Sequence, residues 1–168
     1  MESRAFQDVY PDDLSHCHGC GKNNAQGHQL KSYWLDEPSS HLDSETNAQT
    51  IAHFTPKDCH TAIAGFVYGG LIASLIDCHG TGSASAMAYH YAQRELGSSP
   101  SMRFVTGKLE VNFVAPTPLG PVLELHGTFS EIKERKIIVD ITLSANGKVC
   151  ARGKVIAVKM PDSMGLQT

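Results

Sequence analysis

The sequence carries little net charge. Its 168 residues include 14 Lys and Arg against 17 Asp and Glu, which gives a formal net charge of -3. Proteins that hold nucleic acid through its phosphates present clustered positive charge. The balance found here therefore predicts no nucleic-acid partner, although local basic groups could still hold a phosphate.

The N-terminus lacks the pattern of a secretory signal. Its first residues, MESRAFQDVYPDD, are polar and charged, and no basic segment is followed by an apolar run. The five cysteines are an odd number in a chain that is long enough to fold without disulfides. This usage favours free thiols. Together these observations predict a cytoplasmic protein.

Charge is also missing from the middle of the chain. Between Asp58 and Arg94 the only formally charged residue is Asp77. Glycines interrupt this stretch and the acid lies mid-way along it, so we expect no membrane span. The segment instead predicts a buried element of a soluble domain that carries one acid.

Hydrophobic periodicity predicts two strands, one long helix and then a meander of four strands. The helix should run from Gly69 to about Arg94, because apolar residues at positions 71, 72, 75 and 76 share one helix face. Strands are expected at 30–34, 46–55, 108–114, 122–129, 137–143 and 149–158. Asn146-Gly147 is a hairpin signal between the last two. Because the helix and the strands are segregated, the pattern predicts an α+β domain with an antiparallel sheet.

Three segments follow from this order. We expect an irregular N-terminal segment at 1–27 with a Cys-rich turn, a folded domain at 28–160 and a C-terminal tail at 161–168. One helix against one sheet buries only one helix face. The other face should then be solvated or covered by a partner.

The lone acid lies on the side of the helix opposite the apolar face. Its neighbours there are small: Gly70, Ala73, Gly80, Ala84 and Ala88. Small side chains let a second subunit or a substrate approach closely. An acid without a nearby cation in the sequence is a candidate for a perturbed pKa and for proton transfer. The alternative is a carboxylate that is hydrogen-bonded structurally at a subunit interface.

Gly69 and Gly70 open the helix. First-turn N–H groups lack intrahelical acceptors and lie at the positive end of the helix dipole, so this turn could bind an anion or a developing oxyanion. The alternative is an ordinary tight turn. Asp77 lies seven residues beyond Gly70, about 10 Å along the axis, which is too far for one small reacting group to touch both. A dimer with antiparallel helices would bring the acid of one copy to the donors of another.

Two segments carry a family resemblance. GFVYGGLIASLID and the later KLEVNFVAPTPLG resemble the hotdog-fold thioesterases of the PaaI-like acyl-CoA type. The family pattern is G-x-x-H-G-G, then a helix with an aliphatic pair before an Asp, and later an aromatic residue, two residues and Pro. The segment CHGCGKNNAQGHQL resembles the C-x-G-C-G…N-x-x-G-x-x-L stretch of one branch. The similarity runs from about Cys17 to Val158.

The resemblance implies a fold, an activity and an assembly. The fold is one long central helix wrapped by a curved antiparallel sheet of about six strands, in homodimers or homotetramers with active sites at the subunit interface. The activity is hydrolysis of an acyl-CoA thioester, without metal or other cofactor. The implied roles are an oxyanion donor at Gly69, helped by Gly70, a general base or nucleophile at the partner's Asp77, and a water-positioning group at Thr106.

The sequence departs from the family at two positions. Tyr68 stands where the family has His, and Ala62 stands six residues earlier, where many relatives have Asn or another polar residue. Tyr reaches further than His and cannot mimic a neutral imidazole. We expect Tyr68 and His60 to contact substrate, with His60 replacing one of the missing groups. The alternative is a non-catalytic hotdog module that binds acyl-CoA or a related ligand.

Two further groups of residues are candidates for binding. Arg135 and Lys136 lie in a predicted hairpin tip and could hold the CoA phosphates. The segment His16-Cys17-His18-Gly19-Cys20 resembles half of a zinc site, with Cys59-His60 or Cys78-His79 as possible complements. Structural zinc sites usually show two clean ligand pairs. Only one Cys-x-x-Cys is present, so no metal is expected.

Overall fold

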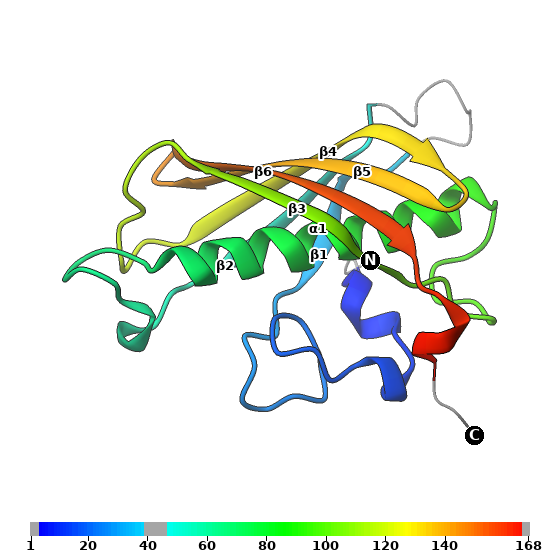
Figure 1. Cartoon of the computed structure of the whole chain (residues 1–168). Coiled ribbons are helices and arrows are strands. Elements are labelled where there is room, and N and C mark those ends of the chain that lie inside the picture. Colours follow the sequence, from blue (N-terminus) through cyan, green and yellow to red (C-terminus); the bar gives the residue numbers. More distant parts are fainter. Residues whose placement is uncertain (1–3, 39–46, 166–168) are drawn as a thin grey trace.

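A long helix lies along a curved six-stranded antiparallel sheet in the computed structural model, which describes residues 4–38 and 47–165 (Figure 1). The strands are β1 (Ser32–Asp36), β2 (Gln49–Phe54), β3 (Phe104–Phe113), β4 (Leu123–Lys133), β5 (Lys136–Ala145) and β6 (Lys148–Lys159), and the helix is α1 (Gly69–Tyr91). Short 3-10 helices are η1 (Phe6–Val9), η2 (Asp12–Leu14), η4 (Asp58–His60) and η5 (Asp162–Met164). The predicted α+β hotdog architecture is confirmed.

The predicted segments at the chain ends and before β2 are only partly described. Residues 1–3 of the N-terminal segment and 166–168 of the C-terminal tail lie outside the described residues. So does the first residue of the strand expected at 46–55. None of the helices in the described part of the chain combines the length and the hydropathy that a membrane crossing needs.

The strand order is β1-β2-β4-β5-β6-β3, so the expected meander of four strands is wrong. β3 pairs with β6, from Phe104 opposite Lys159 to Phe113 opposite Ala151. Only β4, β5 and β6 form a meander. The nine residues between β3 and β4 include three prolines, which cannot donate to a ladder and do not suit a tight hairpin. This connection instead leads from β3, at one edge of the sheet, past β6 and β5 to β4, which lies beside β2.

Side chains of the meander alternate between the core and the outside. Along β5, Ile137, Val139, Ile141 and Leu143 are buried and point toward the helix, while the residues between them are partly exposed. The predicted turn at Asn146-Gly147 is confirmed. Both residues have positive φ, 50° and 74°, as a two-residue hairpin of the I′ type requires.

The apolar face of α1 packs on this sheet as the spacing predicts. Leu71, Leu75 and Ile76 are fully buried. The small residues of the opposite face, where a second subunit or a substrate was expected to approach, have neighbours from the same chain. A Cβ on Gly80 would lie 2.5 Å from Val155 Cγ2 of β6, and Ala84 and Ala88 belong to the buried core. The curved sheet reaches round the helix, so this part of the small-residue face is used inside the chain.

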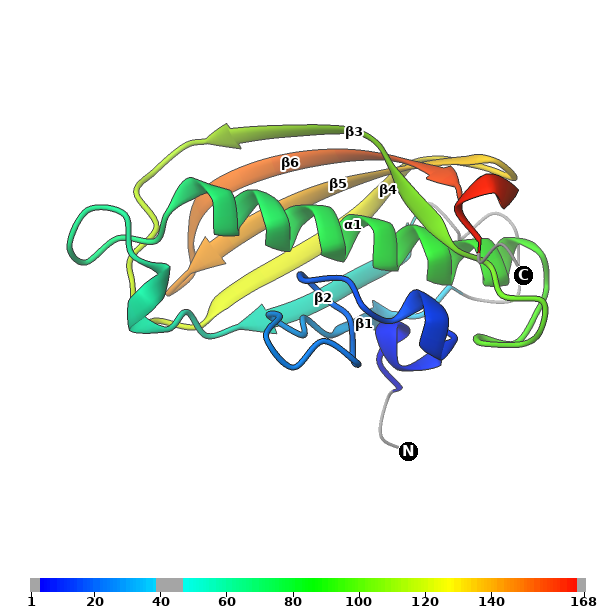
Figure 2. The same cartoon turned by 60° about the horizontal axis from the view of Figure 1, so that its bottom comes forward.

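The N-terminal segment covers much of the remaining helix surface (Figure 2). The Gln7 amide donates to Ser32 Oγ at 3.1 Å and accepts the Ser32 N–H at 2.8 Å. A Cβ on Gly82 would lie 2.6 Å from Gln7 Nε2. Between the sheet and the N-terminal segment, every residue of α1 from Cys78 to Tyr89 is buried within one chain. The expectation that solvent or a partner must cover the second helix face is therefore wrong for this half of the helix.

Candidate functional site

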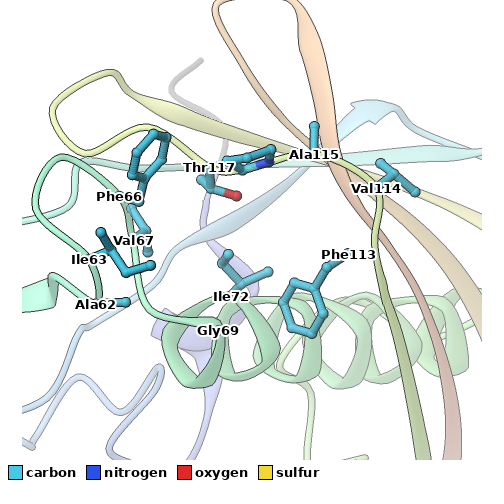
Figure 3. A pocket seen from close by; sticks show the side chains of 11 residues that line it. Ala62, Ile63, Phe66, Val67, Gly69, Ile72, Phe113, Val114, Ala115 and Thr117 are labelled. Carbon is cyan, nitrogen blue, oxygen red and sulfur yellow. The ribbon is translucent and has the colours of Figure 1, made fainter.

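An apolar pocket of about 520 Å³ lies at the N-terminal end of α1, between the loop before the helix and the end of β3 (Figure 3). Two aromatic rings stand on its sides, Phe66 from the loop and Phe113 from β3. Eleven residues line it: Ala62, Ile63, Phe66, Val67, Gly69, Ile72, Phe113, Val114, Ala115, Pro116 and Thr117. A pocket with this lining suits an apolar group rather than a charged one.

The two glycines of the first helical turn lie between aromatic rings. A Cβ on Gly69 would lie 3.2 Å from Phe113 Cζ, and a Cβ on Gly70 would lie 2.7 Å from Tyr68 Cε2. Tyr68 is the N-cap residue, and its side chain makes no capping hydrogen bond. The N–H groups of Gly69 and Gly70 have no intrahelical acceptor because of their position, whereas the Leu71 N–H donates to the Tyr68 carbonyl at 3.2 Å. The turn therefore presents donors beside the pocket that Gly69 lines.

Asp77 of α1 and Thr106 of β3 contact each other at a second site, which lies further along the helix than the glycine turn. The Thr106 hydroxyl, on β3, donates a hydrogen bond to the Asp77 carboxylate. Burial raises the pKa of Asp77 above its ordinary value, while the hydrogen bond from Thr106 opposes this shift. A carboxylate with a raised pKa is a stronger base. The register of β3 against β6 shifts just beyond Thr106, and such a bulge re-aims side chains.

The acid and the glycine turn do not share one pocket within the chain. Asp77 lies eight residues beyond Gly69, roughly 12 Å along the helix axis. Among the described residues, the lining of the pocket includes neither Asp77 nor Thr106. The structure thus brings together two of the predicted catalytic residues, Asp77 and Thr106. Gly69 and Gly70 lie apart from them, at the start of α1.

The thioesterase superfamily is the family whose model matches this chain, over residues 64–152. That span holds α1, β3, β4, β5, the start of β6 and the part of the pocket loop from residue 64 onward. The chain belongs to the thioesterase superfamily. Membership supports thioester hydrolysis as its general chemistry, and the fold found here is that of the family.

Solved structures are also similar to this chain. A thioesterase superfamily protein from Shewanella loihica PV-4 is 51% identical, over 92% of this chain and 99% of that one, with a TM-score of 0.64. The PaaI protein of the Escherichia coli phenylacetic acid degradation operon is 15% identical over 67% and 73% of the two chains, with a TM-score of 0.52. A Streptococcus mutans UA159 protein bound to acetyl-CoA is 17% identical over 76% and 86%, with a TM-score of 0.53. The last two show the shared fold. No curated protein matches this thioesterase superfamily chain.

The two departures from the family pattern lie close to the pocket of this thioesterase superfamily member. Ala62 lines the pocket, and it offers no polar group there. Tyr68 is exposed and lies with its ring against Gly70. Its contact with substrate remains a prediction.

His60 is held by its own loop. Its Nδ1 accepts the backbone N–H of Lys57 at 2.9 Å, and its carbonyl oxygen accepts the N–H of Tyr68 at 3.1 Å. The ring packs against Phe54 and His28, and burial lowers its pKa below the ordinary value. It does not line the pocket. The observed contacts make His60 a support for the loop that leads into α1, and its contact with substrate remains a prediction.

Arg135 and Lys136 lie at the far end of the sheet from the pocket of the same chain. Their turn joins β4 to β5 and lies near the start of β3, since the Arg135 carbonyl accepts the N–H of Lys159 at 3.0 Å, and Lys159 is opposite Phe104. The pocket lies at the other end of β3, by Phe113 (Figure 3). Phosphate binding by these residues stays a prediction.

Three cysteines meet beside Asp77. The thiols of Cys17, Cys20 and Cys78 have sulfur atoms that all lie within 4.8 Å of one another. The neighbouring thiols of Cys20 and Cys78, with backbone amides of the turn, hold the pKa of Cys17 below its ordinary value. His79 points elsewhere, between Ser32 and Thr50. Sequence reasoning found this Cys-x-x-Cys but could not choose Cys78 over Cys59 as its neighbour.

Proposed function

We propose that this thioesterase superfamily member hydrolyses an acyl-CoA thioester to a free acid and CoA. The observation that carries the proposal is the apolar pocket beside the N–H donors of Gly69 and Gly70, which have no intrahelical acceptor. An acyl group in this pocket would bring its thioester carbonyl to the helix N-terminus. The Streptococcus mutans structure bound to acetyl-CoA, which shares the fold, supports CoA esters as the substrate class.

The proposed reaction divides the work between two helices. The Gly69 N–H, helped by Gly70, binds the carbonyl oxygen and stabilises the negative charge that forms there. The Asp77 carboxylate removes a proton from water that attacks the carbonyl carbon, or attacks that carbon itself. The carbon–sulfur bond then breaks and the CoA thiolate takes up a proton. Where Asp77 itself attacks, the acyl group stays on its carboxylate as a mixed anhydride, and water hydrolyses this anhydride to release the free acid and restore Asp77. Thr106 positions the carboxylate through the hydrogen bond described above.

We further propose that each active site is shared between two copies in a homodimer or homotetramer. The reason is the roughly 12 Å of helix between Gly69 and Asp77. Antiparallel α1 helices from two copies would bring Asp77 of one copy to the glycine turn of the other. Proton transfer by a positioned acid contributes about 10²- to 10⁴-fold to rate, so Asp77→Asn should lower kcat by that range on an acyl-CoA panel. Asp140→Asn, which removes an exposed carboxylate paired with Lys154 on the sheet, is the matched control.

The donor can be tested at Gly69 with two matched variants. Gly69 is the first residue of α1, and Tyr68 before it has φ -72° and ψ 144°, so Pro fits at this position without breaking the helix. Gly69→Pro removes the N–H and should lower kcat by about 10²- to 10³-fold. Gly69→Ala keeps the N–H and adds comparable bulk against Phe113. Equal losses in the two variants would contradict the oxyanion role.

Mixing inactive variants tests the shared site. Subunits carrying Asp77→Asn and subunits carrying Gly69→Pro would form mixed dimers in which one of two sites has both groups intact. With free exchange in an equal mixture, about a quarter of wild-type activity should return, from the symmetry of a dimer. No recovery in demonstrably mixed dimers would place the acid and the donors in the same chain.

A non-catalytic ligand-binding module is the second candidate. Tyr68 and the apolar Ala62 stand where many relatives have polar groups, and this favours weak or absent turnover. The module predicts saturable binding of acyl-CoA without hydrolysis, and Asp77→Asn should leave that binding unchanged. Hydrolysis at ordinary enzyme rates would exclude it.

A further inference from the structure

The three thiols beside Asp77 are spaced as ligands of one ion. Cys17 Sγ lies 3.8 Å from Cys78 Sγ, and Cys20 Sγ lies within 4.8 Å of both. All three are free thiols. In a tetrahedral zinc site with Zn–S bonds of about 2.3 Å, the sulfurs lie about 3.8 Å apart. An ion could therefore enter the cluster with only small movements of the Cys20 side chain.

The loop that carries two of these thiols is fixed by backbone hydrogen bonds. The N–H of Gly21 donates to the Cys17 carbonyl at 2.8 Å, and the N–H of Leu30 donates to the Gly19 carbonyl at 3.0 Å. Gly19 lies directly against α1, because a Cβ there would lie 2.2 Å from Cys78 Sγ. Only glycine lets the third sulfur come this close. The site is thus built by the turn and the helix together.

A cation near the cluster balances the charge that three thiolates would bring. Arg103, the residue before β3, interacts electrostatically with all three cysteines. Its guanidinium stacks on the Tyr10 ring, 4.0 Å from the ring centre. Three thiolates around a divalent ion leave a net charge of -1, and the guanidinium offsets it. A partly buried charge needs such a partner.

We propose that Cys17, Cys20 and Cys78 bind one thiophilic divalent cation, of which Zn²⁺ is the first choice. Thiolate sulfur selects this class of ion over Mg²⁺ or Ca²⁺. Within the described residues, the cluster holds no fourth Cys, His, Asp or Glu, so water takes the fourth position on the exposed side of Cys17. The ion ties the N-terminal segment to α1 at the residue after Asp77. This proposal departs from the sequence expectation of no metal.

Co²⁺ titration of the full chain tests the proposal without any substrate. Protein purified with reductant and a chelator, then freed of the chelator, should bind one Co²⁺ per chain. Bound Co²⁺ should give thiolate-to-cobalt charge-transfer absorption and the intense visible bands of tetrahedral cobalt, and Zn²⁺ should displace both. Native mass spectrometry gives the stoichiometry independently.

Cysteine variants decide which thiols are ligands. Cys17→Ser should weaken Co²⁺ binding by more than about 100-fold, since even a second-shell partner of a metal is worth 10- to 100-fold. Its side chain is exposed, so the variant should fold, and Cys78→Ser is the second test. Cys59→Ser and Cys150→Ser are the matched controls and should bind Co²⁺ like wild type.

Three results would overturn the metal site. They are no cobalt absorption in the reduced wild type, equal absorption in Cys17→Ser, and a reductant-resistant disulfide within the cluster that leaves no thiols for Co²⁺. Because the readouts are spectra and mass, they do not depend on whether the protein hydrolyses a thioester. A failed activity assay and a failed metal titration are therefore separate results.

Discussion

His79 should make the fold less stable below pH 6.5. The imidazole is completely buried on α1, with Nδ1 2.9 Å from Ser32 Oγ and Nε2 3.2 Å from Thr50 Oγ1. Burial, with a smaller contribution from His126, lowers its pKa to about 3. The ordinary pKa of a free His is about 6.5. Between these two values the unfolded chain binds a proton that the folded chain does not.

The sign and size of the effect follow from this difference. The lowered pKa of a base contributes stability that is complete above about pH 6.5 and is lost as the pH falls toward 3. Each pH unit in this window costs about 1.4 kcal/mol, so about 2 kcal/mol should be lost between pH 7.5 and pH 5. This loss belongs to His79 alone and adds to those of other titrating groups.

Urea unfolding of wild type and His79→Gln at both pH values isolates the effect. The amide does not titrate, so the free-energy difference between the two proteins should shrink by about 2 kcal/mol from pH 7.5 to pH 5. The cost of altered packing cancels because it is the same at both pH values. Equal protein concentration and a chelator in every sample keep the assembly and the thiol cluster in one state. A difference that does not change with pH would refute the reasoning.

Further variants test the packing, a buried hydroxyl and the hairpin turn. Gly80→Ala should lose about 1–3 kcal/mol of stability by overpacking, because its Cβ would lie 2.5 Å from Val155 Cγ2; an unchanged urea midpoint would show that β6 yields easily. Thr117→Val should leave stability unchanged or raise it, since the Thr117 hydroxyl is buried in the described structure without a hydrogen-bond partner; a clear loss would mean that the hydroxyl is bonded after all. Gly147→Ala should lower the free energy of unfolding by about 1 kcal/mol, because its φ of 74° disfavours a side chain. Asn146→Gly in the same turn is the control and should be near neutral when both variants are compared by thermal unfolding.

The local features of the fold were predictable because they depend on neighbours in the chain. The apolar spacing from Leu71 to Ile76 placed the helix, and Asn146-Gly147 placed a hairpin. The helix began at Gly69, as expected, and the strands of the meander were found within a few residues of their limits. These elements follow from side-chain period and turn chemistry.

Pairings between distant segments were not predictable. Alternation in 108–114 indicates a strand, but it does not say that this strand pairs with β6 rather than β4. The helical projection put Gly80 opposite the apolar face, but it could not show that Val155 of the curved sheet reaches that side. Periodicity describes one element, whereas its neighbours depend on how the whole chain packs.

The sequence by itself determined the family, the helix with its single acid and the glycine pair at its start. Each of those signals is a local motif, because it depends on residues that lie close together in the sequence. Only the tertiary structure decided that Thr106 donates to Asp77, that the pocket lies at Gly69 and Phe113, and that Cys78 rather than Cys59 joins Cys17 and Cys20. Each of these contacts joins residues far apart in the chain, and the curvature of the sheet and the path of the N-terminal segment bring them together.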